Sequence, residues 1–114
     1  MDNIKDDKYY IDKVITDIQF IINHTKDITK SQLEKNEVLV DSVMFRLIQI
    51  SENSNKLTDN FKNYYTDIPW RAIKGLRNRI VHDYGQVDLS VVYDTIKYDI
   101  PETLEILHRS EERR

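Results

Sequence analysis

The chain has 114 residues, of which 32% are charged and 39% hydrophobic, and its net charge is −3 at neutral pH. This balance is that of a folded protein rather than a disordered one, and the length predicts one domain over residues 1–114 that buries about two-thirds of its unfolded surface. The absence of cysteine excludes disulfides, thiolate nucleophiles and cysteine-based zinc sites. The charged N-terminus is not followed by an uninterrupted apolar run, so we expect neither a signal peptide nor a membrane span, and a cytoplasmic protein.

Only two glycines and two prolines occur, none of them before residue 69, which predicts long helices joined by short turns. The first helix is indicated by apolar residues at steps of three and four: Ile11, Val14, Ile15, Ile18, Ile21 and Ile22. Ser31 and Glu34 fit a capping box, which predicts the start of a second helical stretch with a break near Asn36. The same spacing continues that stretch through Val40, Val43, Met44, Leu47, Ile48 and Leu57.

A third helix is predicted to begin after Asp67, because aspartate caps free amides and the following Ile68-Pro69 suits a first turn. It should run from Trp70 to about Tyr84, with Gly85 as its C-terminal cap.

The last helical stretch should be capped by Asp88 and carries an apolar stripe from Leu89 to Leu107. Pro101 lies inside this pattern and should kink it or split it in two. No strand alternation or internal repeat is visible. The sequence therefore predicts an all-α, up-and-down bundle of four or five helices.

The third predicted helix concentrates positive charge. No acidic residue occurs between Ile68 and His82, although the segment holds four cations: Arg71, Lys74, Arg77 and Arg79. At about 100° per residue, Arg77 falls near the middle of an apolar arc made by Trp70, Ile73, Leu76, Ile80, Val81 and Tyr84. A guanidinium there is costly unless it is paired, for which Glu52 is a candidate, or faces a wet interface. Gly75 costs about 1 kcal/mol in a helix interior, which suggests that another surface approaches it closely.

Arg77 and His82 together suggest phosphate chemistry. A histidine can transfer a proton near neutral pH, and a guanidinium can hold a phosphate and stabilise transition-state charge. A step of five residues separates the two side chains by roughly 140°, although the length of arginine relaxes this separation. Twofold pairing of two chains could bring two arginines and two histidines into one cleft. His24 and His108 have no partners at metal-ligand spacing, so neither a metal site nor a cofactor is predicted.

The motif Arg77-x4-His82-x-Tyr84, preceded by Ile68-Pro69-Trp70-Arg71 and Gly75-Leu76 and followed by Val87-Asp88, strongly resembles the HEPN superfamily. It is most similar to the HepT toxins that are encoded beside MNT-type nucleotidyltransferases. The resemblance covers nearly the whole chain, including Arg46-Leu47 and Ser51-Glu52-Asn53-Ser54 where the family has its long central helix. The chain departs from the family at Gly85, where relatives often carry a large apolar residue.

The resemblance implies the toxin of a HEPN/MNT toxin–antitoxin system, a homodimeric and metal-independent endoribonuclease. Arg77 and His82 would be catalytic at the dimer cleft, and RNA would be the substrate. The antitoxin, a nucleotidyltransferase, would attach AMP to Tyr84. Supporting or RNA-binding roles would fall to Asn78, Arg71, Lys74 and Arg79, although a basic run is also typical of a solvated face. The alternatives are a non-catalytic helical partner of the nucleotidyltransferase and a purely structural dimerisation bundle. The paired Arg77 and His82 favour the ribonuclease, because a scaffold has no chemical need of them.

Overall fold

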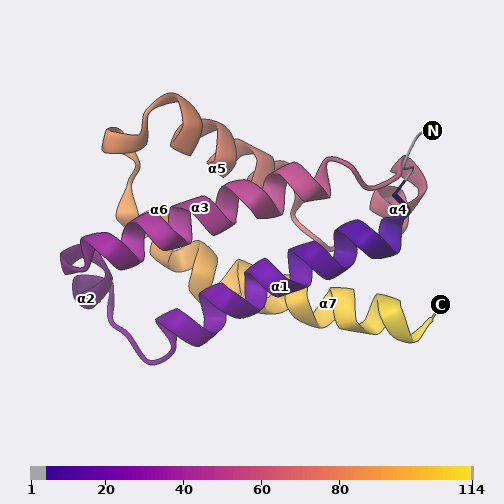
Figure 1. The fold of residues 1–114 in the computed structure, drawn as a ribbon, viewed down its shortest axis with the longest axis horizontal. Coiled ribbons are helices and arrows are strands. Elements are labelled where there is room, and N and C mark those ends of the chain that lie inside the picture. Colours follow the sequence, from indigo (N-terminus) through magenta and orange to yellow (C-terminus); the bar gives the residue numbers. More distant parts are fainter. Residues whose placement is uncertain (1–4, 114) are drawn as a thin grey trace.

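The computed structural model describes residues 5–113, and all regular structure in that range is helical. The elements in chain order are α1 (Asp7–Thr25), α2 (Lys30–Lys35), α3 (Glu37–Ser54), α4 (Asp59–Tyr64), α5 (Trp70–His82), the 3-10 turn η1 (Tyr84–Gln86), α6 (Leu89–Asp94), the π-helical segment η2 (Thr95–Asp99) and α7 (Ile100–Glu112). The long helices α1, α3, α5 and α7 run alternately in opposite directions along the long axis (Figure 1). The predicted all-α bundle is confirmed, with α2, α4 and α6 as short helices between the long ones.

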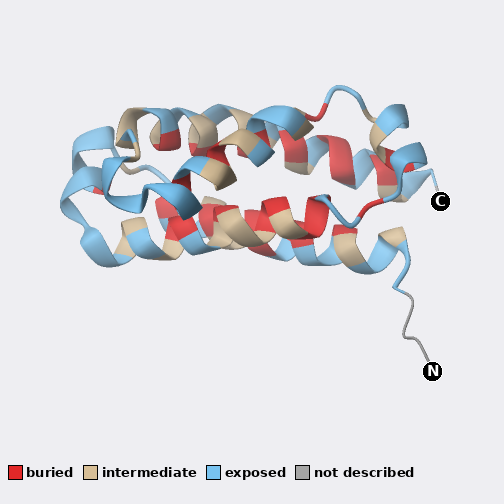
Figure 2. Cartoon of the chain, turned by 90° about the horizontal axis from the view of Figure 1, so that it is seen from above, coloured by how far each residue is buried: buried red, intermediate tan, exposed pale blue. Residues whose placement is uncertain are grey.

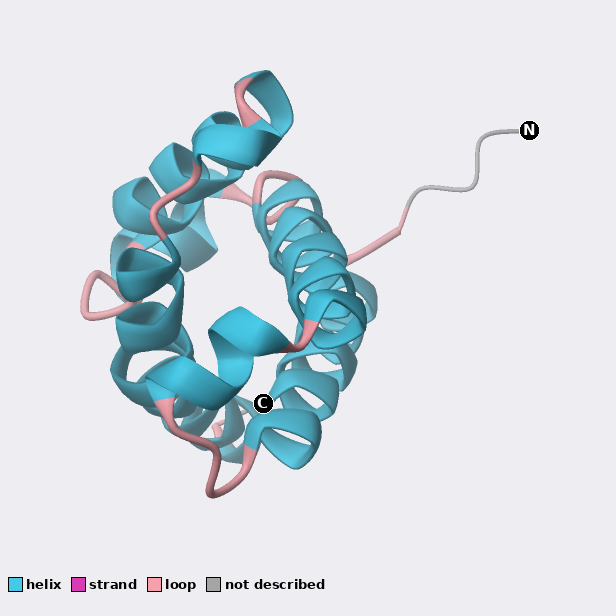
Figure 3. Cartoon of the chain, turned by 90° about the vertical axis from the view of Figure 1, so that its left-hand side faces the viewer, coloured by secondary structure: helices cyan, strands magenta, loops and turns pink. Residues whose placement is uncertain are grey.

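The core lies between α1, α3, α5 and the α6–α7 arm. Figure 2 shows the buried residues on the inner sides of the helices, and Figure 3 shows the helices around this core as seen along the long axis. The apolar stripe predicted for the first helix is buried, apart from the partly exposed Ile22. Burial of this stripe against α3 makes α1 and α3 the central pair, on which α5 packs through α3 and α7 through α1.

The start of α2 differs from the prediction. The capping box is formed by Thr29 and Gln32: the Gln32 amide donates to Thr29 Oγ1 at 3.1 Å, and the Thr29 amide donates to Gln32 Oε1 at 2.8 Å. Ser31 and Glu34 instead lie inside the helix. Both pairs satisfy the sequence pattern, and we attribute the choice to packing, since this start places Leu33 in the helix with its side chain fully buried. The predicted break at Asn36 is confirmed, because its side chain accepts from the Leu39 amide and caps α3.

Both ends of α5 also differ from the prediction. The helix begins at Trp70 without a side-chain cap, so the exposed Asp67 does not cap it. Its start is held instead by the Trp70 indole, whose N–H donates to the carbonyl oxygens of Lys62 and Tyr65 at 3.2 and 3.1 Å. The helix ends at His82, and the chain then turns through η1, which contains Gly85 with an ordinary negative φ rather than a C-cap conformation.

The predictions for the last stretch are confirmed. Asp88 accepts from the Ser90 amide at 2.8 Å and caps α6. The stretch is divided by η2, where the Ile100 amide donates to the Thr95 carbonyl, and Pro101 follows in the first turn of α7. Proline is tolerated there because the first amides of an α-helix have no carbonyl partner within the helix. Among the described helices, none is long and apolar enough to cross a membrane.

Candidate active site

The motif helix α5 packs against α3 (Figure 1), and polar side chains connect α3 to the motif segment at two places, one in α5 and one in η1. Arg77 Nη2 lies 3.4 Å from Glu52 Oε2, and the Tyr84 hydroxyl donates to the Asp41 carboxylate. Each contact joins a residue of the motif segment to a carboxylate of α3. We call the surface along this line the α3–α5 seam.

Arg77 lies at the edge of the buried stripe of α5 rather than near its middle. Ile73, Leu76 and Ile80 are buried, whereas the side chain of Arg77 is 27% exposed. The predicted arc was wrong because the core of this bundle contacts a narrower face of α5, which leaves Val81 and the Tyr84 of η1 exposed.

The guanidinium of Arg77 is held but not fully satisfied. Its predicted pairing with Glu52 is confirmed, and Nη1 donates to Asn78 Oδ1 at 3.1 Å. Its Nε is buried and has no hydrogen-bond partner among residues 5–113. A buried donor without a partner is destabilising. The side chain as a whole is 27% exposed, so an anion can approach the guanidinium from the surface.

His82 is the last residue of α5, and its exposed side chain has no polar partner in the described part of the chain. Within one chain the structure does not bring His82 and Arg77 into contact. The geometry therefore agrees with the roughly 140° separation expected on one helix. The convergence of two copies stays a prediction.

Tyr84 lies at the surface end of the seam. Partial burial, the hydrogen bond to Asp41 and the negative charges of Asp41 and Glu37 raise the pKa of the Tyr84 phenol to about 12. The phenol is therefore protonated at neutral pH. Its side chain is nevertheless exposed, so the hydroxyl lies at the rim of the seam.

The remaining basic residues of α5, Arg71, Lys74 and Arg79, are all exposed. Arg71 and Arg79 line a groove of about 980 Å³ that also contains Gly75. A Cβ built on Gly75 meets nothing within 4 Å, so the close approach predicted for this glycine does not come from the described residues.

Comparison with known proteins then decides the family. A model described as "Ribonuclease HepT-like" matches residues 3–110. The chain belongs to the HepT-like ribonuclease family.

Two relatives match most of both chains. The chain is 30% identical over 94 residues to "Probable ribonuclease HepT" of Thermococcus cleftensis, which covers 82% of this chain and 86% of that protein. It is 31% identical over 98 residues to a "Putative RNase" of Methanocaldococcus jannaschii, and this match covers 86% of this chain and 84% of that protein.

A longer relative matches over only part of its length. This is another M. jannaschii protein, "Gamma-glutamylcyclotransferase and putative RNase", 33% identical over 101 residues. The match covers 89% of this chain but only 46% of that protein. No solved structure matches the chain.

Two features of the seam were not predicted from the sequence. One is Asp41, whose partner Tyr84 is 43 positions away, so no local pattern indicates the pair. The other is the exposure of apolar side chains on both helices, Val38 and Phe45 on α3 and Val81 on α5; Phe45 also lines a hollow with residues of α1. Both helices that carry the seam therefore expose apolar side chains.

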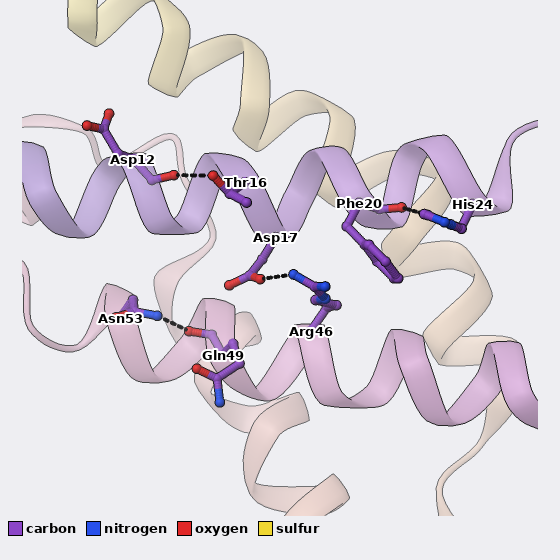
Figure 4. A network of polar contacts seen from close by, with 8 residues as sticks. All are labelled: Asp12, Thr16, Asp17, Phe20, His24, Arg46, Gln49 and Asn53. Carbon is purple, nitrogen blue, oxygen red and sulfur yellow. Dashed lines mark hydrogen bonds and ion pairs between the residues drawn. The ribbon is translucent and has the colours of Figure 1, made fainter.

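A second polar network lies between α1 and α3 (Figure 4). Arg46 Nη1 pairs with Asp17 Oδ1 at 2.8 Å, and the Arg46 guanidinium lies 3.9 Å from the centre of the Phe20 ring. The His24 ring stacks on the same Phe20 ring, and His24 Nδ1 lies 2.8 Å from the Phe20 carbonyl oxygen. This network joins the two central helices, and we interpret it as structural.

Proposed function

We propose that this protein is a metal-independent endoribonuclease that acts as a homodimer and serves as the toxin of a HEPN/MNT toxin–antitoxin pair. The observation that carries the proposal is that one helix of a HepT-like ribonuclease holds both a partly exposed Arg77 and an exposed His82 that has no polar partner within residues 5–113. These side chains supply the two functions that RNA cleavage needs, a group that moves a proton and a group that holds a phosphate.

The reaction follows from these side chains and from RNA itself. His82 accepts the proton of a 2′-hydroxyl, and the resulting oxygen attacks the neighbouring phosphorus. The bond from phosphorus to the 5′-oxygen breaks, and that oxygen takes a proton from a histidinium, for which the His82 of the second copy is available. The products are a 2′,3′-cyclic phosphate and a 5′-hydroxyl. Arg77 stabilises the negative charge on the phosphorane oxygens.

The α3–α5 seam is the surface that we propose for the dimer. Phe45 and Val38 on α3 and Val81 on α5 supply exposed apolar area on the two helices of the seam. Burial of this area in a twofold interface would be favourable, and it would bring two copies of α5 together. The α5 helix would then form part of the interface, with the two Arg77 and two His82 side chains at one cleft.

Tyr84 is the proposed site of silencing by a nucleotidyltransferase antitoxin. Transfer of AMP from ATP forms a bond from the Tyr84 oxygen to the α-phosphorus, releases pyrophosphate, and passes the phenol proton to a base such as Asp41. The modified oxygen could no longer donate to Asp41, and the new negative charge would lie close to Asp41 and Glu37. Repulsion would move the modified Tyr84 away from α3, and the adenosine would obstruct the cleft.

Cleavage is tested with purified protein, total tRNA and EDTA. Wild-type protein should produce fragments with 2′,3′-cyclic phosphate ends. His82→Ala should lose most cleavage and keep its circular dichroism spectrum, whereas His108→Ala, which alters an exposed histidine of α7, should cleave normally. Cleavage that requires magnesium and persists in His82→Ala would refute the mechanism.

Modification is tested by intact mass after incubation with the neighbouring nucleotidyltransferase, ATP and magnesium. We expect AMP-sized additions on the wild type and none on Tyr84→Phe, which keeps the ring and lacks only the acceptor oxygen. Undiminished additions on Tyr84→Phe would assign the modification to another residue.

A further inference from the structure

Two buried serines near the end of α3 have unused hydroxyl groups. Ser51 is 1% exposed and Ser54 is 5% exposed, and neither Oγ has a hydrogen-bond partner within residues 5–113. A buried helical serine ordinarily bonds to a backbone carbonyl one turn earlier, and an unpaired buried hydroxyl is destabilising. Ser51 and Ser54 lie three residues apart on α3, so their side chains are neighbours and one ligand can take both hydroxyl groups.

Both serines line a small hollow between α3, α4 and the start of α5. It measures about 270 Å³, and its other lining residues are Asn55, Lys62, Trp70, Arg71, Ile73 and Lys74. Three of these residues are cationic and none is acidic. We call this hollow the serine pocket.

The start of α5 adds to the positive potential of the serine pocket. The helix begins at Trp70 without a side-chain cap and has no acidic residue in its first turn. The positive end of its dipole and its uncapped amides favour an anion. Because the Trp70 indole is hydrogen-bonded to the backbone at Lys62 and Tyr65, the start of α5 is fixed beside α4. The two serine hydroxyl groups are covered in the free protein, so they become available through a small rearrangement when the phosphate binds.

The chemistry of the lining defines the ligand. Hydroxyl donors beside lysine and arginine side chains match the oxygens of a phosphate group. Lys74 and Arg77 are neighbours at a spacing of three residues on α5, so a strand that follows this helix would pass from the serine pocket to the guanidinium of Arg77.

We propose that the serine pocket binds a backbone phosphate of the RNA strand, adjacent to the phosphate that Arg77 holds for cleavage. This proposal rests on the proposed ribonuclease function and assigns it a second phosphate subsite. Ser51 and Ser54 donate their hydroxyl groups to the phosphate oxygens, and Lys62, Arg71 and Lys74 balance its charge. The subsite positions the strand and takes no part in proton transfer.

Binding is measured by fluorescence anisotropy with a labelled 2′-O-methyl oligoribonucleotide, which keeps the phosphates but cannot be cleaved. The double variant Ser51→Ala/Ser54→Ala should weaken binding by about tenfold. It should unfold at the same or a higher urea concentration than the wild type, because it removes only unpaired hydroxyls. A structural role for the serines predicts the reverse, a change in stability with unchanged binding.

Matched controls lie outside the serine pocket. Thr103→Val in α7 also removes a buried hydroxyl without a described partner, and it should leave binding unchanged. Lys74→Gln should lower the slope of log affinity against log salt by about 1, whereas Lys30→Gln at the start of α2 should not.

Competition identifies the chemistry of the ligand. Inorganic pyrophosphate should displace the oligonucleotide from the wild type at a lower concentration than from the serine double variant. Equal competition in both proteins, or binding of the oligonucleotide that ignores the serine and Lys74 changes, would overturn the proposal. AMP that binds the wild type more tightly than the oligonucleotide would also overturn it, because the site would then be one for free nucleotides.

The outcomes separate this proposal from the proposed function. If the wild type cleaves RNA and the serine variant binds RNA as tightly as the wild type, the phosphate subsite is refuted and the ribonuclease function stands. A wild type whose RNA binding depends on the serines but that never cleaves RNA would keep the subsite and remove the proposed activity.

Discussion

Arg77 and Arg46 form the two ion pairs that α3 makes with other helices in the described chain, and their structural settings predict opposite effects of substitution. Arg77→Ala should leave the fold intact and remove activity. Arg46→Ala should destabilise the fold and leave the activity of the folded molecules unchanged. The two variants therefore act as controls for each other.

The expected magnitudes follow from burial and geometry. Arg77 Nη2 lies 3.4 Å from Glu52 Oε2, and the Glu52 side chain is 42% exposed. Exposed ion pairs of this kind contribute roughly 0.2–1 kcal/mol to stability. Removal of the unpaired Nε of Arg77 offsets this loss by about 1 kcal/mol, so the free energy of unfolding should change by less than about 1 kcal/mol. The Arg46–Asp17 pair is closer, at 2.8 Å, and Asp17 is only 11% exposed, although Arg46 is itself 28% exposed. Breaking a fully buried pair typically costs about 3–5 kcal/mol, so breaking this partly buried pair should cost roughly 2–3 kcal/mol.

The assay combines urea unfolding, followed by circular dichroism, with RNA cleavage under single-turnover conditions. Loss of one donor to a charged transition state lowers the rate by roughly 10²–10³, which we expect for Arg77→Ala. If Arg46→Ala is too unstable to purify, Arg46→Lys can replace it, because lysine retains the charge beside Asp17. Its free energy of unfolding should also fall below that of the wild type, but by less. An Arg77→Ala protein that loses more than about 2 kcal/mol of stability, or that cleaves like the wild type, would refute this reasoning.

Three further predictions concern the seam and the groove. If the proposed dimer forms, wild-type protein should have the mass of a dimer in light scattering and Phe45→Glu that of a monomer, because the substitution places a charge in the proposed apolar interface. An unchanged mass would exclude this face. Folding raises the pKa of the Tyr84 phenol from 10.0 to about 12. The contribution of the protonated phenol to the free energy of unfolding is therefore fully present below pH 10 and is lost as the pH rises to 12. The stability of the wild type should therefore fall more steeply over that range than that of Tyr84→Phe, and parallel curves would contradict the role of Asp41. Gly75→Ala should raise the free energy of unfolding by roughly 0.5–1 kcal/mol, since its Cβ meets no described atom; a loss of stability in a monomeric background would show that a neighbour had been missed.

Local sequence patterns were sufficient for much of the fold. The spacing of Ile11, Ile18 and Ile21 predicted the buried face of α1, and Asn36 and Asp88 predicted helix caps that the structure contains. The split at Pro101 was also predictable, because proline removes a helical hydrogen bond wherever it occurs. The motif segment from Arg77 to Tyr84 indicated the family, which the comparison confirmed.

Tertiary structure decided what depends on residues far apart in the chain. It selected Thr29 over Ser31 as a cap, and it ended α5 at His82 rather than at Tyr84. It also paired Tyr84 with Asp41, 43 positions away, and brought Ser51 beside the cations of α4 and α5. The physical reason is that helix periodicity and capping are set by neighbours within about four residues, whereas burial, ion pairs and pockets depend on how the helices pack against one another.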